Sequence, residues 1–148
     1  MSAALKLFGR DRDDVHIIST YLQDAVGRIG DMTYLENERR FVSVLNRYCW
    51  ENDKSPMRVR AALQIRGVAA IQQRNLVMDK PDAVISLLSV HFDAGEAPTG
   101  IMRLIFAGGG EIRLEVEACE AILEDITAPW SAMSQPAHED DEPQAEGA

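Results

Sequence analysis

Residues 101–126, IMRLIFAGGGEIRLEVEACEAILEDI, are the stretch that decides the predicted fold. Apolar residues alternate with other residues on either side of Gly108–Gly110, and this period of two is typical of paired β-strands. The glycines supply the backbone freedom that a tight reversal needs. The apolar residues that follow fall at helical spacing: Val116, Cys119, Ile122, Leu123 and Ile126. The stretch therefore predicts a hairpin followed by a C-terminal helix over 116–126.

The N-terminal part of the chain predicts a short helix over residues 12–22. Asp11 can accept hydrogen bonds from the first free amides of that helix as an N-cap, and Asp14 stands at the capping-box position three residues later. Both carboxylates also lie at the positive end of the helix dipole. One apolar face follows at helical spacing: Val15, Ile18 and Leu22.

Period-two patterns and β-branched or aromatic residues predict about seven strands in the rest of the chain. The cleanest alternation covers residues 58–66, where every second residue is apolar. Residues 6–8 form either a short strand or an extended lead-in. The seven predicted strands cover residues 29–35, 41–50, 58–66, 68–74, 84–92, 101–106 and 111–116.

These elements predict an α+β fold. Short connections between successive strands require antiparallel pairing, and no alternation of strand and helix favours a parallel sheet. We expect a curled antiparallel sheet or half-barrel of about seven strands, with a short N-terminal helix and a C-terminal capping helix over its open end. This order of elements resembles the pleckstrin-homology-like architecture, a likeness that carries no function by itself.

Composition and charge set the class of protein and its domains. The chain has 148 residues, of which 46% are hydrophobic, so we expect one globular domain over residues 1–136. The formal net charge is −9, and residues 137–148 contribute −5 of it, with five acids and no Lys or Arg. That segment predicts a disordered acidic tail. The remaining −4 argues against a nucleic-acid-binding protein, because such proteins need a cationic surface.

Targeting patterns and cysteine usage predict a cytoplasmic protein. No stretch approaches the ~20 apolar residues of a membrane span, and residues 1–7 lack the apolar run of a signal peptide. Cys49 and Cys119 have no metal-ligand or redox spacing, so they read as reduced thiols. The oligomeric state is not predicted.

No catalytic or cofactor site emerges from the motifs. Gly108–Gly110 lacks the following helix and lysine of a phosphate loop, and Glu111 places a carboxylate beside it. His91 and Asp93 form too small a set for a zinc site. We therefore predict no catalytic residue, no metal and no cofactor.

The strongest candidate site is a row of arginines, which we call the arginine face. Arg58, Arg60, Gln64 and Arg66 project from one side of the strand over residues 58–66, and Arg47 and Arg74 are expected on neighbouring strands. The planar guanidinium suits carboxylate or phosphate groups. The face either binds a protein, an acidic peptide segment or a small anion, or is a solvated surface paired with nearby acids.

Trp50 is the second candidate. Tyr48 and Trp50 stand two residues apart and share one side of a predicted strand, so they form either an aromatic anchor at an interface or part of the core.

Four motifs resemble a family of short alphaproteobacterial proteins that is known only as a domain of unknown function. The motifs are Gln23-Asp24-Ala25, Arg39-Arg40-Phe41, Leu45-Asn46-Arg47-Tyr48-Cys49-Trp50-Glu51 and the run Phe106–Leu114. The resemblance covers roughly residues 5–130. It implies a bacterial cytoplasmic protein and supplies no catalytic residue.

The leading functional hypothesis is a non-enzymatic cytoplasmic binding or adaptor module that acts through the arginine face, a sheet edge or the aromatic strand. The alternative is a small-ligand-binding barrel or weak enzyme with its site inside the curl of the sheet, which requires an apolar cavity with a few convergent polar groups.

Overall fold

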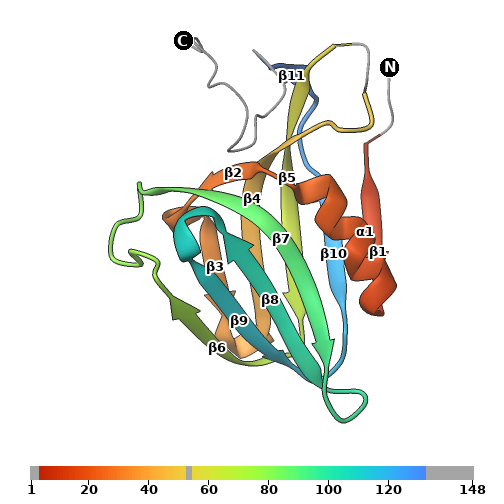
Figure 1. Cartoon of the computed structure of the whole chain (residues 1–148), viewed down its shortest axis with the longest axis vertical. Helices are drawn as coiled ribbons and strands as arrows, with labels where there is room; N and C mark the ends of the chain where they lie inside the picture. Colours follow the sequence, from red (N-terminus) through yellow and green to blue (C-terminus); the bar gives the residue numbers. More distant parts are fainter. Residues whose placement is uncertain (1–3, 53–54, 133–148) are drawn as a thin grey trace.

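A computed structural model describes residues 4–52 and 55–132 of the chain. In this part of the chain one α-helix and eleven strands are present (Figure 1). In chain order they are β1 (Lys6–Gly9), α1 (Arg12–Leu22), β2 (Ala25–Arg28), β3 (Met32–Leu35), β4 (Arg40–Tyr48), β5 (Met57–Arg66), β6 (Val68–Arg74), β7 (Val84–Ala94), β8 (Gly100–Phe106), β9 (Glu111–Val116), β10 (Ala121–Asp125) and β11 (Trp130–Ser131).

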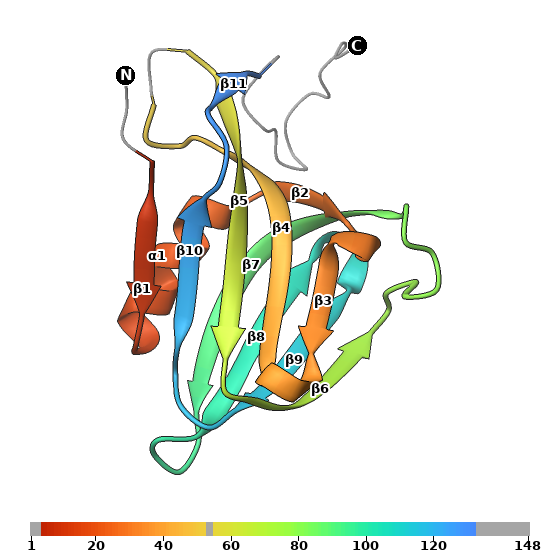
Figure 2. The same cartoon turned by 180° about the vertical axis from the view of Figure 1, so that it is seen from behind.

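All strands belong to one antiparallel sheet that folds over on itself. The order is β1-β10-β5-β4-β2-β7-β8-β9-β6, with β11 added to β5 and β3 added to β4. The sheet is not closed, since its two ends are β1 and β6. Figure 1 shows β6, β7, β8 and β9 as one layer, and Figure 2 shows β1, β10, β5, β4 and β3 as the other. The two layers bury their apolar faces against each other.

The helix α1 has the predicted bounds and lies beside β7 and β1, over the part of the second layer, at β1 and β10, that the first layer leaves uncovered (Figure 1). Asp11 caps it by accepting a hydrogen bond from the Asp14 amide at 2.8 Å. The Asp14 carboxylate in turn accepts one from the Arg10 amide at 3.0 Å. The predicted apolar face is buried: Val15, Ile18 and Leu22.

The predicted glycine hairpin is confirmed. Gly108 and Gly109 have φ angles of 85° and 88°, in the left-handed region that favours glycine. The Phe106 amide donates to the Gly110 carbonyl at 2.9 Å and closes the turn between β8 and β9. These glycines serve backbone geometry at a chain reversal.

The predicted C-terminal helix over 116–126 is wrong. Val116 ends β9, and Ala121–Asp125 forms β10, which lies between β1 and β5. Both of its backbone edges are therefore paired, and this arrangement outweighs local helical spacing. The exposed fractions fit a strand, since Leu123 is 0% exposed and Ile126 is 51% exposed.

The predicted α+β class with about seven strands is also wrong, because the described chain is mostly sheet. Sequence patterns missed β2, a strand of four residues, and β10, whose apolar residues fall at helical spacing. The very short β11 was missed as well, and residues 6–8 proved to be part of β1. Antiparallel pairing is confirmed. The likeness to the pleckstrin-homology-like architecture depended on a C-terminal helix, which the described chain does not have at 116–126.

Three further expectations concern the ends of the chain, the membrane and the thiols. The predicted acidic tail, residues 137–148, lies outside the described residues. Over residues 4–52 and 55–132, no helix has both the length and the apolar character needed to cross a membrane. Cys49 and Cys119 are free thiols, and burial raises the pKa of Cys119 to about 11.

Candidate functional site

The predicted alternation of β5 is confirmed, and it divides the arginines into two faces. Val59, Ala61, Leu63 and Ile65 point into the core, whereas the arginine face points to the outside of the layer formed by β1, β10, β5, β4 and β3. The neighbours of β5 are β4 and β10. Arg74, expected on a neighbouring strand, lies instead in β6 at the far end of the sheet.

The lower half of the arginine face is neutralised by neighbouring side chains. Arg66 forms an ion pair with Glu120 at 3.6 Å. Gln64 accepts a hydrogen bond from Arg40 at 2.9 Å, and Arg40 also pairs with Glu38. This half of the face therefore matches the solvated, paired surface that was the alternative to a binding site.

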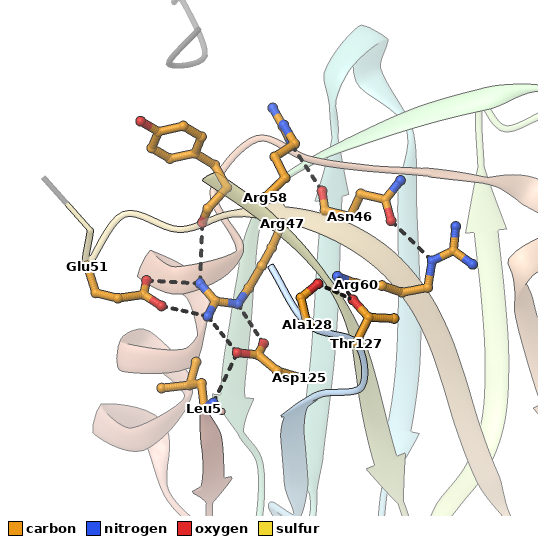
Figure 3. Close-up of polar contacts among 10 residues, drawn as sticks. Leu5, Asn46, Arg47, Glu51, Arg58, Arg60, Asp125, Thr127 and Ala128 are labelled. Atoms are coloured by element: carbon orange, nitrogen blue, oxygen red, sulfur yellow. Dashed lines mark hydrogen bonds and ion pairs between the residues drawn. The ribbon is translucent and has the colours of Figure 1, made fainter. Parts of the chain in front are cut away.

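The upper half of the face contains Arg58 and Arg60 of β5. Within residues 4–52 and 55–132, neither Arg58 nor Arg60 forms an ion pair. Both reach Asn46 on β4: Arg58 donates to its backbone carbonyl at 3.0 Å, and Arg60 donates to its side-chain oxygen at 3.2 Å (Figure 3). Burial lowers the pKa of Arg58, and the charge of Asp24 opposes that shift. The two guanidinium groups are thus held in place by neutral acceptors.

Aromatic side chains flank Arg58 on the same outer face. The register places Trp130 of β11 and Tyr48 of β4 directly across from Arg58. The Arg58 guanidinium lies 5.9 Å from the centroid of the Tyr48 ring, within reach of a cation–π interaction. Trp130 is 40% exposed, which leaves it available to a partner.

Trp50 lies beside Tyr48, in the turn after β4. Its ring meets that of Tyr48 edge-on at 4.8 Å, and its indole N–H donates to the Gln23 carbonyl at 3.1 Å. Trp50 is half-buried and ties the turn to the end of α1. Its predicted contact with a partner is not tested and stays a prediction.

A groove of about 260 Å³ adjoins Arg60 on the outer face. Its apolar wall contains Val84, which is 71% exposed, together with Val26 and Val44. Arg28 and Asp31 also line the groove and form an ion pair with each other at 3.4 Å. Charged and apolar groups therefore lie side by side here, as they do at many protein interfaces.

Arg47 points the opposite way from Arg58 and Arg60, into the interior (Figure 3). Its side chain is 0% exposed and pairs with Asp125, 6% exposed, and with Glu51. The four carboxylate contacts measure 2.8–3.1 Å, and the Tyr48 carbonyl accepts a fifth hydrogen bond at 3.3 Å. All five N–H donors of the guanidinium are thus used.

The electrostatics of Arg47 follow from this geometry. Burial by itself lowers the pKa of Arg47, but the hydrogen bonds to Asp125 and Glu51 outweigh burial and raise it. Burial raises the pKa of Glu51, and the hydrogen bond from Arg47 more than reverses that change, so the pKa of Glu51 is lowered. Arg47 is therefore a charged internal tie and is not positioned to touch a surface partner.

A second groove, of about 330 Å³, opens to solvent between α1 and β7. His16 and His91 line it together with Asp13, Asp93 and other residues, and its surface is mostly polar. His91 Nε2 lies 2.9 Å from the Ser89 hydroxyl. This groove is not the apolar cavity inside the curl that a ligand-binding barrel requires. In the part of the chain that the structure describes, no cluster of three His, Cys, Asp or Glu side chains is arranged to hold a metal.

Glu111, which follows the glycine turn, is buried under two arginines. It accepts hydrogen bonds from Arg74 at 2.9 Å and from Arg103 at 3.1 Å. The hydrogen bond from Arg103 is the main cause that lowers the pKa of Glu111. The carboxylate thus ties β9 to β6 and β8.

Glu111→Gln is expected to lower the free energy of unfolding by about 1.5–3 kcal/mol at pH 7, the usual range for hydrogen bonds to charged groups. Because the folded-state pKa is lowered, this stabilisation is fully present above pH ~4.3, the ordinary value for Glu, and disappears as the pH falls through the folded pKa. Urea unfolding from pH 7 to pH 2 measures the difference, with the exposed Glu115→Gln as control. A difference that stays constant with pH contradicts the prediction.

Sequence reasoning missed two members of this surface and misplaced one. The role of Asn46 was not predicted because an isolated asparagine in a strand has no distinctive pattern. Trp130 lies in β11, a strand of two residues that no sequence pattern indicated. Arg47 shares its face with Phe41 and Leu45 at a spacing of two, and this pattern indicates an inward side chain.

A family model matches residues 5–138, nearly the whole described chain. No curated protein and no solved structure gives a significant match. The match extends the likeness seen in the four sequence motifs beyond residue 130. The chain belongs to the family described as Protein of unknown function (DUF2948).

Proposed function

We propose that this protein is a non-enzymatic binding or adaptor module whose partner is an acidic peptide segment of another protein. The partner would bind across the upper arginine face, which we define as Arg58, Arg60 and their common acceptor Asn46. The observation that carries the proposal is the pair of arginines that form no ion pair within residues 4–52 and 55–132 although the chain is acidic overall.

The geometry of the pair supports recognition of carboxylates. Arginine presents a planar fork that can donate two parallel hydrogen bonds to one carboxylate. Arg58 and Arg60 each use one donor on Asn46, so further N–H groups of both remain for a partner. Two carboxylates spaced two residues apart in an extended peptide would match them, because such residues point to the same side.

The surroundings of the pair support a protein partner over a small anion. Arg, Trp and Tyr are the residue types that contribute most to protein interfaces, and Trp130 lies directly across from Arg58. On the other side, Arg60 borders the groove that contains the exposed Val84. An apolar side chain of the peptide would bury area there, which a small anion cannot do.

The cellular setting is part of the same proposal. Free Cys49 and Cys119 support a reducing compartment, and we place the protein in the cytoplasm. The four motifs that resemble a family of short alphaproteobacterial proteins support a bacterial source.

The double substitution Arg58→Glu and Arg60→Glu tests the proposal. Tagged wild-type and variant chains are expressed in the native host, and their partners are identified by affinity purification and mass spectrometry. We expect a specific partner of the wild type to bind the variant at least tenfold more weakly, because attraction of its carboxylates becomes repulsion. Purified partner then gives the dissociation constants.

The matched control is Arg10→Glu with Arg113→Glu, which changes the net charge equally. Both control residues are exposed, lie away from β5 and form no ion pair in the described part of the chain. Thermal melting of both variants checks that they fold. An unchanged set of partners in the Arg58/Arg60 variant contradicts the proposal, as does an equal loss in the control.

A further inference from the structure

We propose that the acidic segment at residues 137–148 binds the upper arginine face of its own chain and competes there with the partner. The competition rests on the proposed function, whereas binding of the segment to Arg58 and Arg60 does not. The occupant is therefore a part of the same molecule, and the bound partner would displace it.

The position of β11 delivers the segment to this face. Trp130 pairs with Arg58, Ser131 pairs with Met57, and the Ala132 amide donates to the Pro56 carbonyl at 3.0 Å. The chain thus leaves the described structure within two strand positions of Arg58. No other part of the arginine face lies as near to the point where the described chain ends.

The length of the segment is sufficient. From Ala132, level with Pro56, to Arg60 the path along β5 is about 13 Å, at ~3.3 Å per strand residue. The seven residues from Ala132 to Glu139 can span up to ~25 Å when extended. Glu139 and the three acids after it can therefore reach both arginines even though β11 leads the chain away from Arg60.

Charge complementarity selects this segment as the occupant. Residues 137–148 contain five acids and no Lys or Arg, and four of the acids are consecutive, Glu139–Glu142. The other arginine of the face on β5, Arg66, is already neutralised by Glu120, and the neighbouring Arg40 of β4 is paired with Glu38. Arg58 and Arg60 are the guanidinium groups of this face that remain available.

Because the segment is attached to the chain, even a weak interaction keeps it bound for an appreciable fraction of the time. A short flexible connection gives an effective concentration of roughly millimolar. A segment that would bind in trans with a millimolar dissociation constant is then bound for about half the time in cis. A partner must compete with this local concentration, so its apparent affinity is lowered about twofold or more.

The test neutralises the segment within the full chain: Glu139→Gln, Asp140→Asn, Asp141→Asn and Glu142→Gln. The readout is the ¹H–¹⁵N NMR signals of the Arg58 and Arg60 side-chain Nε–H groups. In about 20 mM salt, where the Debye length is roughly 20 Å, we expect these signals to differ between wild type and variant. In about 500 mM salt, with a Debye length near 4 Å, the two spectra should coincide.

A control variant neutralises four exposed acids elsewhere: Glu36→Gln, Asp79→Asn, Glu96→Gln and Glu115→Gln. These residues form no ion pair in the described part of the chain. We expect the Arg58 and Arg60 signals of this control to match the wild type. Coincident spectra of wild type and segment variant at low salt overturn the proposal, and so does an equal change in the control.

A synthetic peptide of residues 133–148 supplies a second measurement. We expect it to bind the segment variant at least twofold more tightly than the wild type, and not to bind a segment variant that also carries Arg58→Glu and Arg60→Glu. Equal affinity for wild type and segment variant overturns the proposal. If partner binding depends on Arg58 and Arg60 but the segment has no effect, the segment proposal fails and the proposed function stands. If the segment binds Arg58 and Arg60 but partner binding does not depend on them, the proposed function fails and binding of the segment stands.

Discussion

Arg47→Ala is expected to lower the free energy of unfolding by about 3–5 kcal/mol, the range for breaking a buried ion pair by removal of one partner. Asp125 is only 6% exposed in its side chain, so the substitution leaves a carboxylate in the interior without its counter-charge. The loss is large because Arg47 joins β4, β10 and the turn that carries Glu51, and Asp125 also accepts the Leu5 amide at 3.0 Å. Urea unfolding of the wild type and of Arg47→Ala at pH 7 measures this loss of free energy.

Two comparisons separate this effect from a general loss of a long side chain. Arg113→Ala removes an exposed arginine and should change the free energy of unfolding by less than ~0.5 kcal/mol. Arg47→Lys keeps the charge but not the five-donor geometry, so it should fall between wild type and Arg47→Ala. A loss below ~1 kcal/mol for Arg47→Ala would falsify the description of Arg47 as an internal tie.

Leu123→Asp is expected to unfold the domain or to lower its stability by more than ~4 kcal/mol. Leu123 is 0% exposed, and in the sheet it lies between Leu7 of β1 and Leu63 of β5. A carboxylate at this position has no partner in an apolar interior, and burial of such a group is costly even when it becomes protonated. Far-UV circular dichroism and thermal melting measure the effect.

Ile126→Asp is the matched control, and it also distinguishes a strand from a helix at this position. In a helix over 116–126, Ile126 would share the buried stripe with Leu123, and both substitutions would be severe. In the observed structure Ile126 follows β10 and is 51% exposed, so its replacement should cost less than ~0.5 kcal/mol. Equal melting temperatures of Leu123→Asp and the parent would rule out the observed packing of β10.

Much of the secondary structure was predictable from local patterns. The helix α1 was predicted with its bounds and cap, because Asp11 and the spacing of its apolar residues are properties of consecutive residues. The strands β5, β6, β8 and β9 were predicted for the same reason, since period-two alternation is local. The wrong helix at 116–126 arose where a short apolar run fits both periods and only its partners decide.

The candidate site was predictable only in part. The alternation of β5 predicted that Arg58, Arg60, Gln64 and Arg66 share a face, and the structure shows this. It could not show that Glu120 neutralises Arg66 while Asn46 holds Arg58 and Arg60, because those residues come from other strands. Whether the face binds a partner stays a prediction.

The sequence by itself determined the local elements, the antiparallel character of the sheet and the existence of an arginine row, because each depends on residues within a few positions of one another. Only the tertiary structure decided that 121–125 is a strand between β1 and β5, and that Arg47 points inward to Asp125, 78 residues away. The physical reason is that backbone hydrogen bonds in a sheet and counter-charges in an interior are supplied by distant segments. The segment that folds against a strand edge or a guanidinium therefore decides whether its hydrogen bonds and its charge are satisfied.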